Sequence, residues 1–179
     1  MQLRQHAPFS KTSATDPPGV IFIIYYTTST SEQLTVSASR AKIHPVHILL
    51  ATDAQWVLDE VLAALGSPDT SFTVCRNGRD VPEAIATRTP DVAVLDLQIG
   101  SMGAMAVTMD LRLDHSDHRI PNVPVLMLLD RKADVHLARR SGANGWIIKP
   151  LDALRLQRAA NAVASGESWH DGEVLAANA

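Results

Sequence analysis

Short apolar runs alternate with amphipathic segments through most of the chain. The runs are four to six residues long and occupy five stretches: 46–51, 71–76, 91–96, 124–129 and 145–148. Most are apolar at nearly every position and are bounded by turn residues. Such runs are typical of strands that are buried on both faces of a parallel sheet.

The segments between these runs carry apolar residues at helical spacing. In the first, they recur from Trp56 to Leu65, and Gly66 ends the pattern. We predict helices over 56–65, 80–86, 104–113, 133–141 and 151–164, with Trp56 in the core and Asp80 as a candidate N-cap. Five strands that alternate with five helices predict one doubly wound α/β domain with right-handed crossovers.

The two ends of the chain lack this alternation. Residues 1–43 are rich in Ser, Thr and Pro without a sustained period, so we predict a mostly disordered tail before a domain at 44–165. Within that tail, the apolar run 20–26 is too short for a signal peptide or a membrane span and reads as an isolated strand or a sticky segment. Residues 166–179 form a short tail, too few for a helix-turn-helix output domain, and Trp169 and His170 have no evident role there.

Composition narrows the classes of function. The net charge of −3 and the pI of about 6.1 argue against sequence-independent nucleic-acid binding, which needs a basic surface. The single cysteine, Cys75, excludes an internal disulfide and fits a reducing cytoplasm. Because Cys75 lies in an apolar run, we predict that it is a small core residue.

Polar residues gather where the predicted strands end. Asp53, Asp96 and Lys149 follow the first, third and fifth strands, and the carboxyl ends of parallel strands meet at one edge of the sheet, where ligands bind. A carboxylate can attack phosphorus, and Mg²⁺ and a lysine can offset the charge of the transferred group. The combination favours phosphoryl chemistry.

Each residue also has a plainer interpretation. Asp96 could cap a turn, Asp53 could be the N-cap of the first helix, and Lys149 could lie in a solvated loop. The cluster at 114–119, with two His and two Asp, could hold a metal ion but reads better as a solvated loop. We favour phosphoryl chemistry because Asp53, Asp96 and Lys149 occur together at the ends of the predicted strands.

The pattern resembles the receiver domain of bacterial two-component response regulators. The resemblance covers residues 44–165 and rests on four segments: 48–53, 90–97, 123–128 and 141–150, the last ending in Trp-Ile-Ile-Lys-Pro. It implies a flavodoxin-like (βα)5 fold with a five-stranded parallel sheet in the order 2-1-3-4-5.

The resemblance also implies a role for each matching residue. Asp96 matches the phosphoacceptor, and Lys149 matches the lysine that contacts the phosphoryl group. Asp53 and Asp96 match Mg²⁺ ligands, together with the backbone carbonyl of Gln98. Trp146 matches the aromatic switch residue on the last strand.

Several positions depart from the family pattern. Thr52 replaces the first acid of the metal-binding pair, so we expect a weakened Mg²⁺ site in which the hydroxyl could still hold a metal-bound water. Leu129 replaces a Ser or Thr of the switch and offers no hydrogen-bond donor, and we expect the neighbouring Asp130 to face solvent. The loop 98–104 lacks the usual proline and Asp-Gly, and its glycines suggest a flexible or differently shaped loop.

We therefore expect a stand-alone receiver of a phosphorelay in the cytoplasm, with no enzymatic activity beyond phosphoryl transfer to and from Asp96. The implied partners are a sensor histidine kinase or phosphotransfer protein and a downstream protein on the surface of 133–141, 145–148 and 151–164, with a homodimer as another option; we expect no direct nucleic-acid or membrane contact. A degenerate receiver that works without phosphorylation is the alternative. A flavin or nucleotide carrier on the same fold is disfavoured because no phosphate-binding glycine motif occurs, and DNA binding through dimerisation is weaker still.

Overall fold

A computed structural model describes residues 9–11, 20–24 and 46–172. The strands are β1 (Phe9–Lys11), β2 (Val20–Ile24), β3 (Val46–Ala51), β4 (Thr70–Cys75), β5 (Val92–Asp96), β6 (Val125–Leu129), β7 (Gly145–Ile148) and β8 (Trp169–His170). The helices are α1 (Gln55–Leu65), α2 (Val81–Thr87), α3 (Ala104–Ser116), α4 (Val135–Ser141) and α5 (Ala153–Ala164), with short 3-10 turns η1 (Gly78–Asp80) and η2 (Lys132–Asp134) before α2 and α4.

The five predicted strands form the parallel centre of one sheet. Their order is β4-β3-β5-β6-β7, which confirms the predicted order 2-1-3-4-5. The sheet is wider than the predicted five strands. β8 adds a parallel strand beside β7, and β1 and β2 add an antiparallel pair beside β4.

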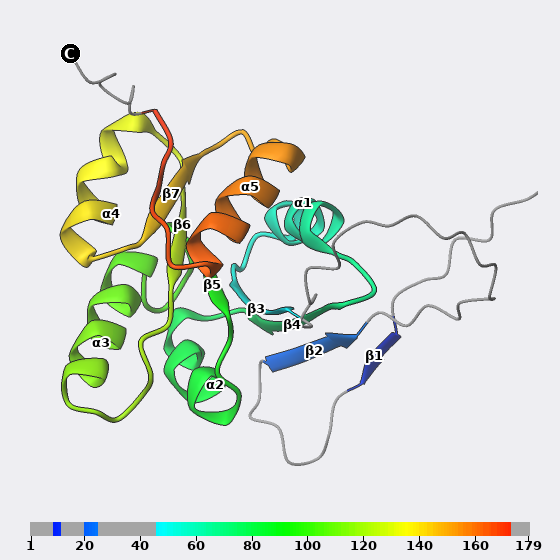
Figure 1. The fold of residues 1–179 in the computed structure, drawn as a ribbon, viewed down its shortest axis with the longest axis horizontal. Helices are drawn as coiled ribbons and strands as arrows, with labels where there is room; N and C mark the ends of the chain where they lie inside the picture. The colour runs from blue at the N-terminus through cyan, green and yellow to red at the C-terminus, as the bar shows by residue number, and fades with distance from the viewer. Residues whose placement is uncertain (1–8, 12–19, 25–45, 173–179) are drawn as a thin grey trace, which may run out of the picture.

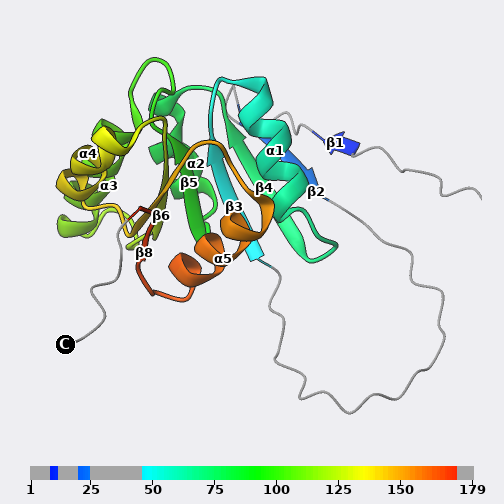
Figure 2. The same cartoon turned by 90° about the horizontal axis from the view of Figure 1, so that it is seen from above.

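The helices cover both faces of this sheet, as Figures 1 and 2 show. α1 and α5 pack on one face, and α2, α3 and α4 pack on the other. Alternate residues of β3 serve the two layers: Ile48 and Leu50 face α1 and α5, whereas Leu49 and Ala51 face the opposite layer. Burial on both faces explains why the strands are apolar throughout.

The ends of the chain contain more structure than the sequence pattern indicated. Within the segment predicted as a disordered tail, residues 9–11 and 20–24 are strands, and β2 pairs with β4 rather than standing alone. Residues 1–8, 12–19, 25–45 and 173–179 lie outside the described residues. In the predicted C-terminal tail, β8 runs between α4 and α5, where Figure 1 draws it in red.

The prediction for Trp56 is wrong, whereas that for Cys75 is confirmed. Trp56 is 51% exposed, because Val57, Val61 and Ala64 set the buried face of α1 and Trp56 is turned about 100° away from Val57. Cys75 is fully buried, and burial raises the pKa of its thiol to about 12.

Candidate functional site

The candidate site lies at the carboxyl ends of the central strands. Thr52 follows β3, Asp96 ends β5, Asp130 follows β6 and Lys149 follows β7. Since these strands are neighbours in the sheet, the four side chains meet although they are far apart in sequence.

Asp96, the predicted phosphoacceptor, is almost completely buried. Asp96 is 2% exposed, and both oxygens of its carboxylate accept hydrogen bonds. Oδ1 accepts a hydrogen bond from Nζ of Lys149 at 2.8 Å, and Oδ2 accepts one from the Thr52 hydroxyl at 2.9 Å. The backbone N–H of Gln98, in the turn after β5, donates to Oδ1 at 3.4 Å. Thr52, Gln98 and Lys149 thus converge on Asp96, so Asp96 does more than cap a turn.

Lys149 is held between two carboxylates rather than lying in a solvated loop. Its side chain is 10% exposed, and Nζ also donates to Oδ1 of Asp130 at 2.9 Å. The indole of Trp56 faces the same ammonium, with Nζ 5.2 Å from the ring centroid, a cation–π contact. Burial lowers the pKa of Lys149, but the hydrogen bonds and charges of Asp96 and Asp130 outweigh it, so the pKa is raised overall. The ammonium therefore stays charged at neutral pH.

The prediction that Asp130 faces solvent is wrong. Its side chain is only 33% exposed, Oδ1 pairs with Lys149, and Oδ2 is a buried atom without a hydrogen-bond partner among the described residues. The reason is electrostatic: the Lys149 ammonium lies close to the end of β6 and attracts the carboxylate inward. Sequence reasoning missed both Asp130 and Trp56 as site residues, although the place of Asp130 directly after a strand was a usable signal.

Asp53 lies at the rim and organises the neighbouring loop. Its Oδ2 accepts the backbone N–H of Gly100 at 3.1 Å, and the loop is anchored again where Gly78 donates its N–H to the Gly100 carbonyl. Gly78 must be glycine, because a Cβ there would lie 1.8 Å from the Met102 carbonyl oxygen. The N-cap of α1 is Ala54, so Asp53 does not cap that helix.

The acidic edge carries residues that could hold Mg²⁺. Within the described ranges, no group of three or more His, Cys, Asp or Glu is placed to hold a metal ion, and this applies also to the cluster at 114–119. The acidic edge offers Asp53 and Asp96, and Mg²⁺ needs only one or two carboxylates because it keeps several waters. Thr52 supplies a hydroxyl instead of a third charge, and that hydroxyl already donates to Asp96.

Trp146, the predicted switch residue, is fixed by the C-terminal strand. It is 1% exposed, and its indole N–H donates to the Asp171 carbonyl at 3.1 Å. The imidazole of His170 stacks on it, and the Arg139 guanidinium lies 5.7 Å from its ring. Leu129, the other predicted switch position, is fully buried and offers no hydroxyl. Trp169 and His170, to which the sequence pattern gave no role, form this extra strand.

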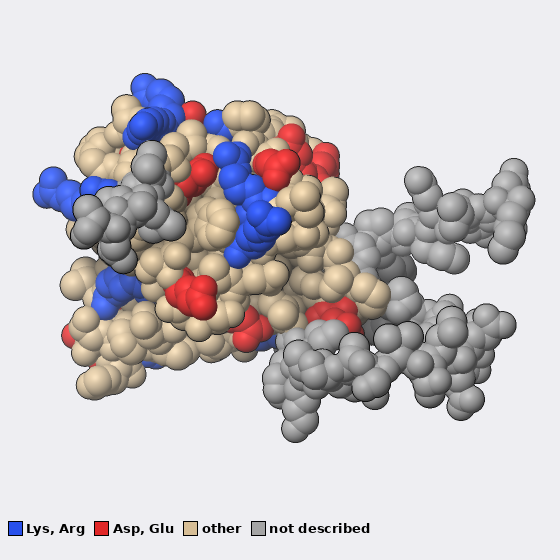
Figure 3. Space-filling view, turned by 45° about the horizontal axis from the view of Figure 1, so that its top comes forward, with Lys and Arg blue, Asp and Glu red and all other residues tan. Residues whose placement is uncertain are grey.

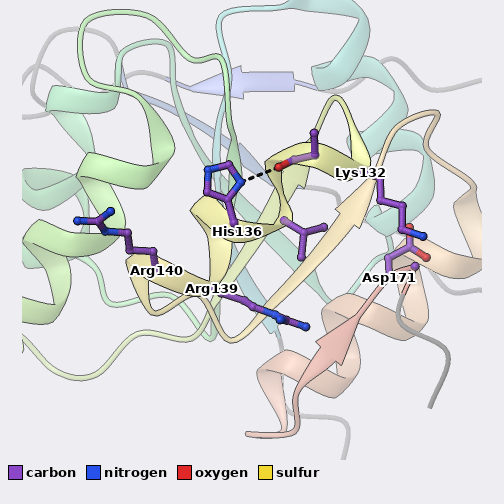
Figure 4. A pocket seen from close by; sticks show the side chains of 8 residues that line it. Lys132, His136, Arg139, Arg140 and Asp171 are labelled. Atoms are coloured by element: carbon purple, nitrogen blue, oxygen red, sulfur yellow. Dashed lines mark hydrogen bonds between the residues drawn. The ribbon is translucent and has the colours of Figure 1, made fainter. Parts of the chain in front are cut away.

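The predicted partner surface carries a basic pocket. It measures about 650 Å³ and lies between α4 and the segment after β8, as Figure 4 shows. Its polar lining consists of Lys132, His136, Arg139, Arg140 and Asp171. Figure 3 shows Lys and Arg side chains on the side of the molecule that α4 forms and in a second band nearer the middle of this face.

Comparison with known proteins identifies the protein family to which the chain belongs. The sequence profile of the response regulator receiver domain matches residues 48–161. The chain therefore belongs to the response regulator receiver domain family, and the resemblance proposed from the sequence is confirmed.

Related proteins agree with this assignment. The chain is 34% identical over 101 residues to the DNA-binding transcriptional regulator NtrC of Escherichia coli strain K12, a match that covers 55% of this chain and 20% of NtrC. It is 26% identical over 119 residues to protein PilH of Pseudomonas aeruginosa, covering 66% of this chain and 98% of PilH. The chain thus spans about a fifth of the NtrC relatives and nearly all of PilH.

Solved structures show the same fold. The signal receiver domain of the response regulator NarL from Mycobacterium tuberculosis superposes with a TM-score of 0.60 at 25% identity, covering 69% of this chain and 99% of that domain. The chemotaxis response regulator CheY4 of Vibrio cholerae gives a TM-score of 0.58 at 19% identity, with 66% and 98% covered. In the part of the chain that the structure describes, no helix combines the length and apolar character needed to cross a membrane.

Proposed function

We propose that this receiver domain accepts a phosphoryl group on Asp96 and passes the signal on through protein contacts. The observation that carries the proposal is the buried pair of Asp96 and Lys149, joined at 2.8 Å where the strands end. A nucleophilic carboxylate beside a cation that stays charged is what phosphoryl transfer requires.

The chemistry follows from this arrangement. A carboxylate oxygen of Asp96 attacks phosphorus of the donor, the bond from phosphorus to its leaving group breaks, and the bonding electrons depart with that group. An acyl phosphate on Asp96 results, and the Lys149 ammonium pairs with a phosphoryl oxygen. Bound Mg²⁺ would supply further charge neutralisation, held by Asp53, Asp96 and the Gln98 carbonyl, with Thr52 acting through a water. Self-catalysed transfer to Asp96 and hydrolysis from it are the only catalysis in this proposal.

The partners are those that this chemistry needs. A sensor histidine kinase or a phosphotransfer protein would supply the phosphoryl group in the cytoplasm, and a downstream protein or a second copy would meet the surface of α4, β7 and α5. NtrC is a DNA-binding regulator, but this chain matches only about a fifth of it, so DNA binding is not carried over. PilH is matched over 98% of its length, so the receiver domain is the part of this chain on which the proposal rests.

Phosphorylation is tested by intact-mass analysis after incubation with acetyl phosphate and Mg²⁺. We expect one added phosphoryl group, about 80 Da by the formula HPO₃, in the wild-type chain and none in Asp96→Asn, because the amide lacks the nucleophilic carboxylate. Anion-exchange chromatography would separate the two forms and give the fraction modified. An adduct that persists in Asp96→Asn would place the chemistry elsewhere.

A degenerate receiver is the second candidate, and two observations favour it. Thr52 takes the place of an acid, and Leu129 leaves the switch position without a donor. If neither acetyl phosphate nor beryllofluoride modifies or binds the chain, this second function replaces the first. The interaction surface of α4, β7 and α5 would then be constitutive.

A further inference from the structure

Lys149 is shared between two carboxylates, and only one of them belongs to the predicted site. An ammonium has three N–H donors and no acceptor. One donor goes to Oδ1 of Asp96 and another to Oδ1 of Asp130, at 2.8 Å and 2.9 Å. The face of Trp56 lies against the same ammonium at 5.2 Å. Little of the ammonium is left for a third anion.

The position of Asp130 is not that of an incidental surface acid. Its Oδ2 is buried without a hydrogen-bond partner among the described residues, an arrangement that costs free energy unless the charge is compensated nearby. Lys149 supplies that compensation. The guanidinium of the next residue, Arg131, forms its ion pair with Asp134 at 3.1 Å and interacts with Asp130 only as a nearby charge.

We propose that Asp130 is an internal competitor that holds Lys149 away from an incoming phosphoryl group and so limits how readily Asp96 is phosphorylated. The proposal rests on the proposed function and concerns the regulation of the same site. A phosphoryl group on Asp96 needs the ammonium, and it also places negative charge close to the Asp130 carboxylate. Both effects of the Asp130 carboxylate oppose phosphorylation.

The neighbouring residue increases the dependence on Lys149. Leu129, which precedes Asp130 and is fully buried, offers no hydroxyl to the phosphoryl oxygens. The lysine is therefore the only side-chain cation that the described residues place directly on Asp96. The residues that bind the Lys149 ammonium therefore determine the affinity of the site for an anion. Asp130 is a positioning residue in this sense, since it acts through Lys149.

Phosphorylation would also release Asp130. When Lys149 turns to the phosphoryl group, the Asp130 carboxylate loses its partner at the start of the segment that leads through η2 into α4. The released charge would leave its buried position for water, and the backbone before α4 would move with it. The contact between Lys149 and Asp130 would thus couple the site to α4. No hydroxyl at position 129 is needed for this coupling.

The test compares rates of labelling by acetyl phosphate with Mg²⁺ in wild type, Asp130→Asn and Asp130→Glu. Asp130→Asn keeps the shape and removes the charge, so we expect labelling of Asp96 to be faster by on the order of tenfold. Asp130→Glu keeps the charge and should stay close to wild type. Asp69→Asn, an exposed acid in the turn before β4, is the control for net charge. Midpoints of thermal unfolding show whether each variant is folded.

The outcomes separate this inference from the proposed function. Slow labelling of wild type and of Asp69→Asn, with fast labelling of Asp130→Asn, supports the competition. Equal or slower labelling of folded Asp130→Asn overturns it while Asp96 remains the phosphoacceptor. If no variant is labelled on Asp96, the proposed function itself fails and the competition fails with it. Beryllofluoride titration gives a second readout, in which Asp130→Asn should bind on the order of tenfold more tightly.

Discussion

The indole of Trp146 stacks on the imidazole of His170, with ring centroids 4.2 Å apart and 13° between the ring planes. This pair joins the last central strand, β7, to the added strand β8. Asp171 completes the connection, because its carboxylate accepts the N–H of Ile148 at 3.0 Å and pairs with Arg155 at 3.2 Å. The C-terminal segment thus holds both β7 and α5.

The first prediction concerns this connection. In Asp171→Ala, the Ile148 N–H loses its acceptor and Arg155 loses its ion pair, so we expect the free energy of unfolding to fall by about 1–3 kcal/mol. Chemical denaturation measures the loss, and hydrogen exchange should show faster exchange at Ile148. Glu167→Ala, an exposed acid of the same segment, is the control and should change little. Unchanged exchange at Ile148 would contradict a structural role for Asp171.

The positions of Asp96 and Lys149 at one edge could be predicted from the sequence. Buried strands have a strong apolar signal, and the topology of a doubly wound sheet then fixes which residues share an edge. The directions of Asp130 and Trp56 could not be predicted in this way. The direction of Asp130 depends on the charge of Lys149, which follows the neighbouring strand of the sheet. The direction of Trp56 depends on which face of α1 packs against the sheet.

The pairing of the short strands at the margins could not be predicted, for a different reason. β8 has two residues, too few to show a period, and it is held mainly by partners such as Trp146 that lie elsewhere in the chain. β2 was visible as an apolar run, but nothing in its pattern indicated that it would pair with β4. Pairing between distant segments is a property of the folded chain rather than of a local pattern.

The second prediction tests whether Thr52 weakens the binding of Mg²⁺ at the acidic edge. Thr52→Asp adds a carboxylate beside Asp96 and Asp53, so Mg²⁺ should bind on the order of tenfold more tightly because more negative charge faces the cation. Isothermal titration of the purified chain with MgCl₂ measures this affinity. Without Mg²⁺ the variant should be less stable than wild type, because two carboxylates would then share a buried position. Thr52→Ser keeps the hydroxyl and is the matched control; the idea fails if Thr52→Asp and Thr52→Ser bind Mg²⁺ equally.

The third prediction concerns the charge of Lys149. Lys149→Met leaves Asp96 and Asp130 without their cation, and removing one member of a buried ion pair costs several kcal/mol, so we expect a loss of about 3 kcal/mol. The folded-state pKa of Lys149 is raised above its ordinary 10.5. Its contribution is therefore complete below 10.5 and is lost as the pH rises through the folded-state value. Urea denaturation from neutral to alkaline pH should show this decline in wild type.

Lys132→Met is the matched control for that experiment, since Lys132 is an exposed lysine beside the basic pocket. It should keep the alkaline decline of wild type. If Lys149→Met keeps the same decline as well, the pH dependence arises from another group. A stability of Lys149→Met equal to that of wild type would contradict the buried ion pair itself.

The fourth prediction concerns His47, a buried histidine of β3 that lies away from the carboxyl edge. Its residue is 4% exposed, its Nε2 is 2.8 Å from the Thr73 hydroxyl, and its Nδ1 is 3.4 Å from the Thr89 carbonyl. Burial, with a smaller contribution from the charge of Arg88, lowers the pKa of His47 below the ordinary 6.5. The folded chain therefore favours the neutral imidazole, whereas the unfolded chain takes up a proton below pH 6.5.

The sign of the pH effect follows from that difference. The contribution of neutral His47 is present above pH 6.5 and is lost as the pH falls through the lowered folded-state pKa. The free energy of unfolding should fall between pH 7.5 and pH 5 in wild type and less in His47→Gln, which cannot take up the proton. Urea denaturation at both pH values measures this change in the free energy of unfolding. The control is His118→Asn, which should retain the wild-type response. His118 is exposed and has a positive φ, a conformation that asparagine tolerates. Burial between Thr73 and Thr89 makes protonation of His47 unfavourable in the folded chain. An equal pH response in His47→Gln and wild type would contradict this, because it would mean that the folded chain protonates His47 at little cost.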